Sequence, residues 1–297
     1  MIPVLFEVGP IKIYSYGLML GIAFILGSYI LSLELKRKKL DPNLASTITL
    51  LAVVFGISGA KLLYLIEHWS QFLEEPFDMT FSAGGLTWYG GFIVGLTAVF
   101  VYVRSKNVPF LKIWDGLGLA LILAYGVGRV GCHLSGDGDY GIPTKLPWGT
   151  IYAEGVAKPT VMLRDYFERN PEERSVWAYD SLRATRTGTD KLGKTITRFD
   201  EVTTVHPTPI YELILGIIGF IFLWNLRKKD FPDGKLFMIY VMLASTFRFF
   251  MEYLRLQPRL LFSLTEAQLL SVILFVLGLM GMIYIDRRHA TKPSKTA

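Results

Sequence analysis

The sequence is poor in cysteine and in charged residues. Cys132 is the only cysteine in a chain of 297 residues, which excludes an intramolecular disulfide and a metal site built from several thiolates. Charged residues make up 19% of the chain and hydrophobic residues 52%, a balance unlike that of a soluble domain. Residues 1–7 also lack the basic stretch that opens a cleavable signal peptide, so we expect the first hydrophobic segment to direct membrane insertion. The composition predicts an integral membrane protein.

Seven hydrophobic segments reach the length of roughly 20 residues that a helix needs to cross a bilayer. Because lipid offers the backbone no hydrogen-bonding partner, we expect each segment to be helical. The predicted fold is therefore an all-α integral membrane protein with seven transmembrane helices in a single polytopic domain, residues 1–297. The segments run approximately over residues 13–35, 43–66, 84–103, 113–134, 209–226, 236–255 and 267–286.

Basic residues gather in alternate loops between these segments. By the positive-inside rule, this alternation places the N-terminus outside and the C-terminus in the cytoplasm. The same flanking residues account for the net charge of +6, so the charge does not indicate a nucleic-acid partner. Residues 136–208, the longest polar stretch, become a small extracytoplasmic head inserted within the membrane domain. The basic loops contain Lys36–Lys39, Arg104 with Lys106, Arg227–Lys229 and Arg287–Arg288, whereas the second loop carries Glu67, Glu74, Glu75 and Asp78.

The stretch Gly126–Gly141, rich in glycine, joins the fourth hydrophobic segment to the polar head. Arg129 lies near the end of the hydrophobic segment, where an unpaired guanidinium is costly. The glycines around it permit close backbone approach. This pattern predicts capture of an anionic group such as a lipid phosphate. The alternative is an arginine that only extends to the lipid headgroups.

Three charged residues lie within the sixth segment. Arg248, Glu252 and Arg255 are separated by four and three residues, which places them on one helical face. Such a face cannot point toward lipid, and its surplus positive charge favours anion binding. The alternative is an ion network that only holds the helices together.

Other polar or aromatic residues stand at the ends of the segments. Lys61, inside the second segment, needs a partner such as Glu67 or a lipid phosphate. Tyr89 follows two glycines and a tryptophan at the start of the third segment, which suits either a cavity or an interfacial aromatic belt. His206, before the fifth segment, is either a proton carrier or a surface histidine. Glu212 follows it, and the helix dipole is sufficient reason for an acid there.

Together, these segments resemble prolipoprotein diacylglyceryl transferases. That family transfers diacylglycerol from phosphatidylglycerol to the lipobox cysteine of prolipoproteins in the bacterial cytoplasmic membrane, releases glycerol phosphate, and uses no metal or nucleotide cofactor. The resemblance implies that Arg129 binds the phospholipid headgroup and that Arg248, Glu252 and Tyr16 line the active cavity. The matching stretches are Tyr16–Met19, Gly59–Lys61, Gly90–Gly91, Gly128–Gly131, His206–Glu212 and Arg248–Arg255.

From the residues and the resemblance together, we predict two overlapping sets of site residues. The catalytic set is Arg129, Arg248, Glu252, Tyr16 and Tyr89, and the substrate-binding set is Arg129, Arg248, Arg255, Lys61, Ser135, Asp137 and His206.

The chain departs from the family pattern at two places. Family members usually carry histidine where this chain has Tyr89, and two asparagines and a glutamate where it has Cys132, Ser135 and Asp137. Because the nucleophilic thiol comes from the substrate, Cys132 is interpreted as a packing residue. Three proton acceptors stay open: a Tyr89 made acidic by nearby cations, His133 or His206, or none at all, if the substrate thiol ionises unaided beside the arginines.

Three other functions compete with this interpretation. A phospholipid or anion transporter would use the same arginines to bind and release its substrate. A metal-dependent lipid enzyme would use Asp137 and Asp139, although a hard cation needs more oxygen ligands than these two supply. A divergent paralogue with altered lipid-transfer activity would fit the departures from the family pattern.

The topology has a direct test. A cysteine placed at Ser181, in a chain whose natural thiol is removed by Cys132→Ser, lies in the polar stretch predicted to be outside. It should react with a membrane-impermeant thiol reagent in intact spheroplasts. Labelling that appears only after lysis would contradict the orientation derived from the basic loops.

Overall fold

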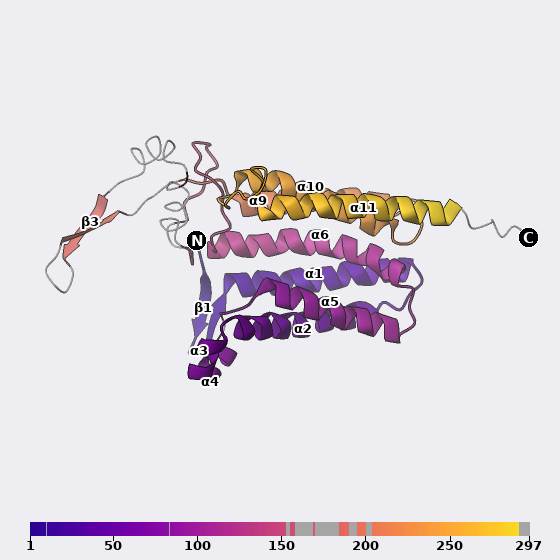
Figure 1. The fold of residues 1–297 in the computed structure, drawn as a ribbon, viewed down its shortest axis with the longest axis horizontal. Helices are drawn as coiled ribbons and strands as arrows, with labels where there is room; N and C mark the ends of the chain where they lie inside the picture. Colours follow the sequence, from indigo (N-terminus) through magenta and orange to yellow (C-terminus); the bar gives the residue numbers. More distant parts are fainter. Residues whose placement is uncertain are drawn as a thin grey trace, which may run out of the picture. The chain divides into compact units, whose positions relative to one another are not determined.

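A computed structural model (Figure 1) describes residues 1–9, 11–82, 84–152, 155–157, 169, 184–189, 195–199 and 204–290. Ser181, the position chosen for the topology test, lies outside these ranges. The predicted boundaries of the extracytoplasmic head therefore stay a prediction.

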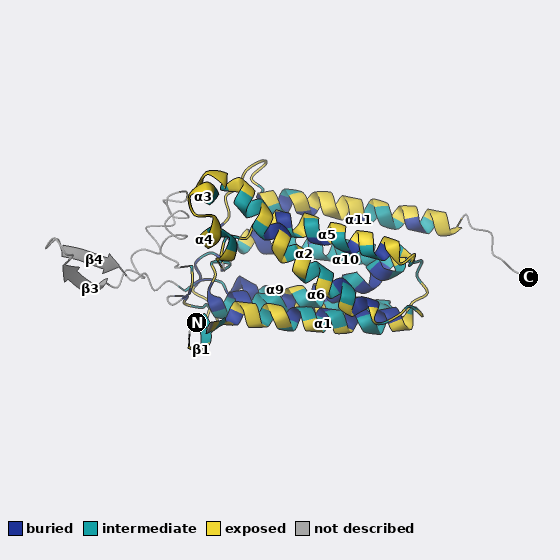
Figure 2. Cartoon of the chain, turned by 90° about the horizontal axis from the view of Figure 1, so that it is seen from below, coloured by how far each residue is buried: buried dark blue, intermediate teal, exposed yellow. Residues whose placement is uncertain are grey.

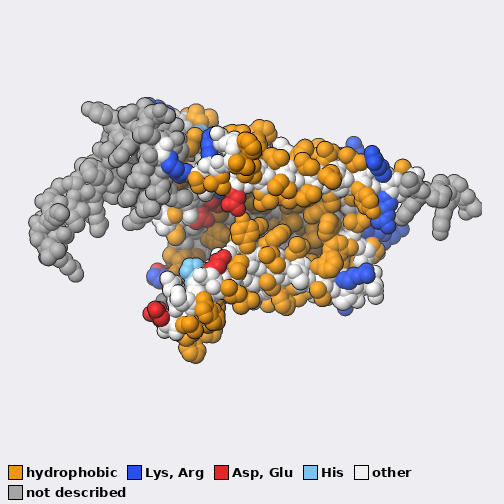
Figure 3. All heavy atoms as spheres, viewed as in Figure 1, with side chains coloured by type: hydrophobic (Ala, Val, Ile, Leu, Met, Phe, Trp, Pro, Cys, Tyr) orange, Lys and Arg blue, Asp and Glu red, His pale blue; other side chains and the backbone are white. Residues whose placement is uncertain are grey.

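Within the described residues, seven helices are long and apolar enough to cross a membrane, which confirms the predicted fold class. Exposed residues run along α11 (Figure 2), and hydrophobic side chains cover most of the helical surface in the view of Figure 3. Such a surface suits contact with lipid. The helices are α1 (Ser15–Arg37), α2 (Leu44–Glu67), α5 (Trp88–Ser105), α6 (Phe110–Ser135), α9 (Thr208–Leu226), α10 (Lys235–Met251) and α11 (Glu266–Ala290).

Shorter elements were not expected from the hydrophobic pattern. An antiparallel hairpin, β1 (Val4–Val8) with β2 (Ile11–Tyr14), precedes α1. Short helices α3 (Trp69–Glu74) and α4 (Pro76–Phe81) follow α2. A 3-10 turn, η1 (Glu252–Leu254), ends α10, and a second antiparallel pair joins β3 (Ala184–Thr189) to β4 (Thr195–Phe199). Hydropathy does not detect such elements because they are shorter than a membrane span.

The chain divides into two compact units, each described by itself. One unit comprises Leu26–Ala120, and the other comprises Met1–Ile25 together with Leu121–Ala297. Helices α1 and α6 contribute to both units.

In the unit Leu26–Ala120, helices α2 and α5 pack through glycines. A side chain at Gly59 would collide with the carbonyl of Gly90, and one at Gly90 with the carbonyl of Gly59. The small-residue face of α2 is thus a helix-packing surface. Helix α5 begins at Trp88, later than predicted, because Gly85 lies against the Tyr64 ring with a φ of +67°.

Lys61 is held by the loop that leads into α5. Its ammonium donates to the Ser82 carbonyl at 3.0 Å and the Gly84 carbonyl at 2.9 Å. Glu67, which the sequence suggested as its partner, instead accepts a 2.6 Å hydrogen bond from the Thr87 hydroxyl. Of the two partners that the sequence left open for Lys61, Glu67 is thus bound elsewhere.

In the other unit, α9, α10 and α11 form one layer, with α10 packed against both neighbours (Figure 1). Beyond the end of α6, Tyr140 and Tyr152 stack with ring centroids 4.9 Å apart and are buried together with Val205 and Leu256. Backbone pairing also joins Gly141 to Arg255. This small core fixes the loop that follows α6 against the start of α9 and the end of α10.

Candidate functional site

Three arginines and three carboxylates meet in the unit formed by Met1–Ile25 and Leu121–Ala297. They come from the ends of three membrane-spanning helices and from the loops beside them. Arg129 Nε lies 2.6 Å from Glu212 Oε2, and Arg248 Nη2 lies 3.1 Å from Glu252 Oε2. Arg255 Nη1 lies 3.0 Å from Asp139 Oδ1. The arginine–carboxylate cluster consists of Arg129, Arg248, Arg255, Asp139, Glu212 and Glu252.

Glu212 lies at the centre of this cluster. Its carboxylate contacts Arg129, and its Oε1 lies 3.4 Å from Arg248 Nη1 and 3.6 Å from Arg255 Nη2. The residue is 3% exposed. A dipole interaction at the start of α9, which the sequence suggested as sufficient, is therefore an incomplete account of Glu212. The missed signal was its position inside a membrane-spanning segment, four residues after the start of α9 at Thr208.

The surplus positive charge of the sixth segment is balanced by carboxylates from other segments. Glu212 and Asp139, which come from other segments, bring the carboxylates to the same number as the arginines. Arg255 also does not share a helical face with Arg248, because α10 ends at Met251 and Arg255 is extended, with a φ of −94°. It reaches the cluster because the turn η1 and the pairing with Gly141 bring it back.

Local sequence explains how α6 and α9 present their side chains. A Cβ at Gly131 would lie 3.2 Å from the Tyr16 Cα, so this glycine lets α6 approach the start of α1 beside Arg129. Pro207 precedes α9, which begins at Thr208 and has a proline in its first turn. The Thr208 hydroxyl donates to the Asp139 carbonyl at 2.5 Å. These contacts hold the loop of Asp139 above the buried Glu212.

Arg129 is further held by Tyr125, one turn earlier in α6. The guanidinium lies 4.9 Å from the centre of the Tyr125 ring, and its Nη2 donates to the Tyr125 hydroxyl at 3.1 Å. Tyr125 was not among the predicted residues, although its spacing of four from Arg129 would have placed the two on one helical face. The cation–π contact and the hydrogen bond orient the guanidinium.

The charges of Asp139 and Arg255 stabilise each other outside the membrane-spanning segments. Burial acts to raise the pKa of Asp139, but the guanidinium groups of Arg255 and Arg129 hold that pKa below its ordinary value. Burial likewise acts to lower the pKa of Arg255, and Glu212 and Asp139 raise it above its ordinary value. Asp139 is therefore an anion at neutral pH.

The two histidines near the site bind tyrosines. His206 Nδ1 lies 3.1 Å from the Tyr211 hydroxyl, which also accepts a 2.7 Å hydrogen bond from Trp148 Nε1. Partial burial lowers the pKa of His206, so it is neutral at pH 7. His133 Nδ1 lies 2.8 Å from the Tyr152 hydroxyl.

The other predicted residues divide between the two units. Ser135 is buried and donates to the Cys132 carbonyl at 3.3 Å, and Asp137 accepts a hydrogen bond of 3.3 Å from the Asp139 amide. Lys61 and Tyr89 belong to the unit Leu26–Ala120. Tyr89 is half exposed and packs edge-on against Trp88, with centroids 5.3 Å apart. Roles for these four residues stay predictions.

The possible metal ligands Cys132, Asp137 and Asp139 have donor atoms within 4.8 Å of one another. Arg129 Nη1 binds Asp139, however, and lies 3.5 Å from the Cys132 sulfur. The guanidinium thus puts a positive charge among the donors, where a metal cation would be repelled. These contacts favour an anion at this place over a metal ion.

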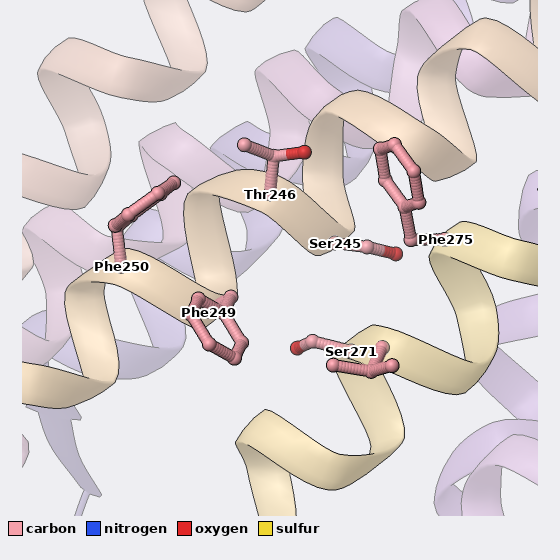
Figure 4. Close-up of a pocket in the computed structure, with 7 residues that line it drawn as sticks. Ser245, Thr246, Phe249, Phe250, Ser271 and Phe275 are labelled. Carbon is pink, nitrogen blue, oxygen red and sulfur yellow. The ribbon is translucent and has the colours of Figure 1, made fainter.

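An apolar cavity of about 200 Å³ lies between α10 and α11 (Figure 4). Its serine and threonine hydroxyls donate to carbonyls four residues earlier on their own helices, as Ser245 does to Val241 at 2.7 Å. They therefore bring little polar character to the cavity, which is lined by Ser245, Thr246, Phe249, Phe250, Ser271, Val272 and Phe275. The buried charges lie instead in the arginine–carboxylate cluster.

Within the described residues, seven helices able to span a membrane and a cluster of buried arginines define a polytopic membrane protein. A family model described as prolipoprotein diacylglyceryl transferase matches residues 3–284, so the chain belongs to that family. The chain is 28% identical to phosphatidylglycerol–prolipoprotein diacylglyceryl transferase of Clostridium tetani, over 97% of this chain and 98% of that one. It is also 28% identical to phosphatidylglycerol–prolipoprotein diacylglyceryl transferase of Clostridioides difficile, over 98% of both chains. The protein is thus a membrane transferase of lipoprotein biosynthesis.

The central role of Glu212 gives a stability prediction. Glu212→Gln leaves three guanidinium groups without their shared anion, and we expect it to lower the free energy of unfolding by about 3 kcal/mol. Adding Arg248→Gln should recover part of this loss, because it removes one of the stranded cations. Denaturant titration of the purified protein in micelles measures both effects. Strictly additive losses would contradict the shared-anion arrangement, and Glu7→Gln, in the exposed pair with Lys12, serves as the control.

Proposed function

We propose that this protein transfers the diacylglyceryl group of phosphatidylglycerol to the lipobox cysteine thiol of prolipoproteins and releases glycerol phosphate. The observation that carries the proposal is the convergence of Arg129, Arg248 and Arg255 on one buried carboxylate. Guanidinium groups bind phosphate oxygens in pairs, and the site lies at the ends of membrane-spanning helices, within reach of a lipid headgroup. Membership of the family supports the same substrates.

In the proposed reaction, the lipid phosphate binds Arg129, assisted by Arg248 and Arg255. The substrate thiolate attacks the carbon of the diacylglycerol moiety that is bonded to the phosphate oxygen. A carbon–sulfur bond forms, the carbon–oxygen bond to the phosphate breaks, and the electron pair leaves with glycerol phosphate. Fixed cations stabilise the charge that develops on this leaving group. The proton of the thiol is lost before attack, because the thiolate is the reactive form.

Glu252 and Tyr16 have supporting roles in this proposal. Glu252, which is 3% exposed, pairs with Arg248 and fixes the direction of its guanidinium. The Tyr16 backbone packs against Gly131, two residues after Arg129 in α6. We further propose that the enzyme acts in the bacterial cytoplasmic membrane, with its N-terminus outside and its C-terminus in the cytoplasm, so that the arginines meet substrate at the outer leaflet.

Arg129 provides the sharpest test of headgroup binding. Arg129→Ala and Arg129→Lys should both abolish transfer from labelled phosphatidylglycerol to a lipobox peptide in proteoliposomes, while the protein stays inserted. Lysine keeps the charge but loses the planar pair of donors that grips two phosphate oxygens. Normal turnover by the lysine variant would refute the binding of two phosphate oxygens by the Arg129 guanidinium. Release of glycerol phosphate by the wild type separates a transferase from a transporter of the same lipid.

The missing family histidine gives a second functional prediction. A tyrosine with a pKa of ~10 is a poor base at neutral pH, whereas a thiol near ~8.5 ionises readily beside cations. Tyr89→Phe should therefore lower turnover only modestly, and His133→Ala and His206→Ala should each leave measurable activity. The same transfer assay, run from pH 6 to 9, checks all three variants. Complete loss in a folded variant would identify that residue as the base.

A further inference from the structure

The Asp139 carboxylate bridges two of the three arginines of the site. Its Oδ2 binds Arg129 Nη1, and its Oδ1 lies 3.0 Å from Arg255 Nη1. One oxygen for each of two guanidinium groups is also the arrangement in which two oxygens of a phosphate would be held. Asp139 thus makes the contacts that an anionic ligand would make.

Asp139 differs from Glu212 in how firmly it is held. Glu212 belongs to helix α9 and is 2% exposed in its side chain, whereas the Asp139 side chain is 30% exposed and belongs to a loop. Gly138, immediately before it, has a φ of +96°, and Tyr140, immediately after it, is buried. The loop backbone is therefore anchored, while the short carboxylate side chain can leave the arginines by rotating toward solvent. Its greater contact with water also weakens the ion pairs of Asp139 relative to those of the buried Glu212.

The net charge of the cluster depends on whether the Asp139 carboxylate lies against the arginines. With Asp139 in place, the three arginines face three carboxylates, and the cluster offers no excess positive charge to a phosphate. Once Asp139 turns away, Arg129 and Arg255 each lose a partner, and only Glu212 and Glu252 remain to balance the three cations. The cluster becomes a site for one anion when this carboxylate leaves it.

We propose that Asp139 is a placeholder for the phosphate group: it neutralises Arg129 and Arg255 in the empty enzyme, yields to the phosphate of the lipid, and returns as glycerol phosphate leaves. This inference rests on the proposed function, because it concerns the same phosphate site. Only molecules in which Asp139 has left the arginines can bind a phosphate. The apparent affinity for every phosphate ligand is therefore the intrinsic affinity multiplied by the fraction of such molecules. Competition by Asp139 therefore favours release of the product.

The test measures binding of glycerol phosphate to the purified full-length protein in lipid nanodiscs by calorimetry. Asp139→Asn keeps the shape of the side chain and removes its charge, and we expect it to bind glycerol phosphate roughly tenfold more tightly than the wild type. Asp139→Ser, which removes the charge with a smaller side chain, should do the same and replaces the first variant should that fail to fold. Glu7→Gln removes a negative charge from the exposed pair with Lys12 and is the control for a general change of charge, with an affinity like that of the wild type.

Kinetics give an independent readout. Without the placeholder, KM for phosphatidylglycerol should fall, and product inhibition by glycerol phosphate should become stronger. If the Asp139 carboxylate served as a base or only stabilised the fold, its removal would lower kcat without tightening phosphate binding. That result overturns the proposal. Equal or weaker binding by both Asp139 variants also overturns it.

The outcomes also separate this inference from the proposed function. Transfer by the wild type, together with unchanged phosphate affinity in the Asp139 variants, removes the placeholder and leaves the transferase. Glycerol phosphate that binds neither the wild type nor the Asp139 variants contradicts both proposals. If both proposals are correct, the Asp139 variants bind glycerol phosphate more tightly than the wild type. Adding Arg129→Ala to these variants then abolishes the binding.

Discussion

The contact between one buried carboxylate and three guanidinium groups is the interaction on which the site depends. Glu212 touches Arg129, Arg248 and Arg255, and these arginines come from α6, from α10 and from the turn that follows α10. Cations at such positions are tolerated in a membrane protein only when they are paired. One anion on α9 thus allows three cations to be held together at the ends of these helices.

This arrangement needs an exact approach of backbone elements, and glycine and short loops provide it. Gly131 brings α6 against the start of α1, and pairing of Gly141 with Arg255 returns the end of α10 to the loop of Asp139. Buried aromatic rings of Tyr140 and Tyr152 anchor that loop. Dispersion and packing hold these elements, because helices within lipid gain little from the hydrophobic effect.

Under the proposed mechanism, a site whose charges are balanced before the lipid binds reconciles two requirements of membrane chemistry. Unpaired arginines would be costly, yet a phosphate must find unpaired arginines when it arrives. A fixed anion, Glu212, and a more exposed one, Asp139, meet these requirements separately. The same separation explains why a cluster without net charge still suits an anionic substrate.

Hydropathy alone determined the seven helices and their approximate ends, because crossing a bilayer demands long apolar runs that are visible in the sequence. Arg129, Arg248 and Glu252 were recognisable as candidate site residues, and they do lie in one cluster, because charge inside such runs is expensive. The central place of Glu212, the bridge made by Asp139 and the return of Arg255 through a turn were decided only by the tertiary structure. Ion pairs between distant segments depend on how helices and loops pack in space, and no local pattern of residues records that packing.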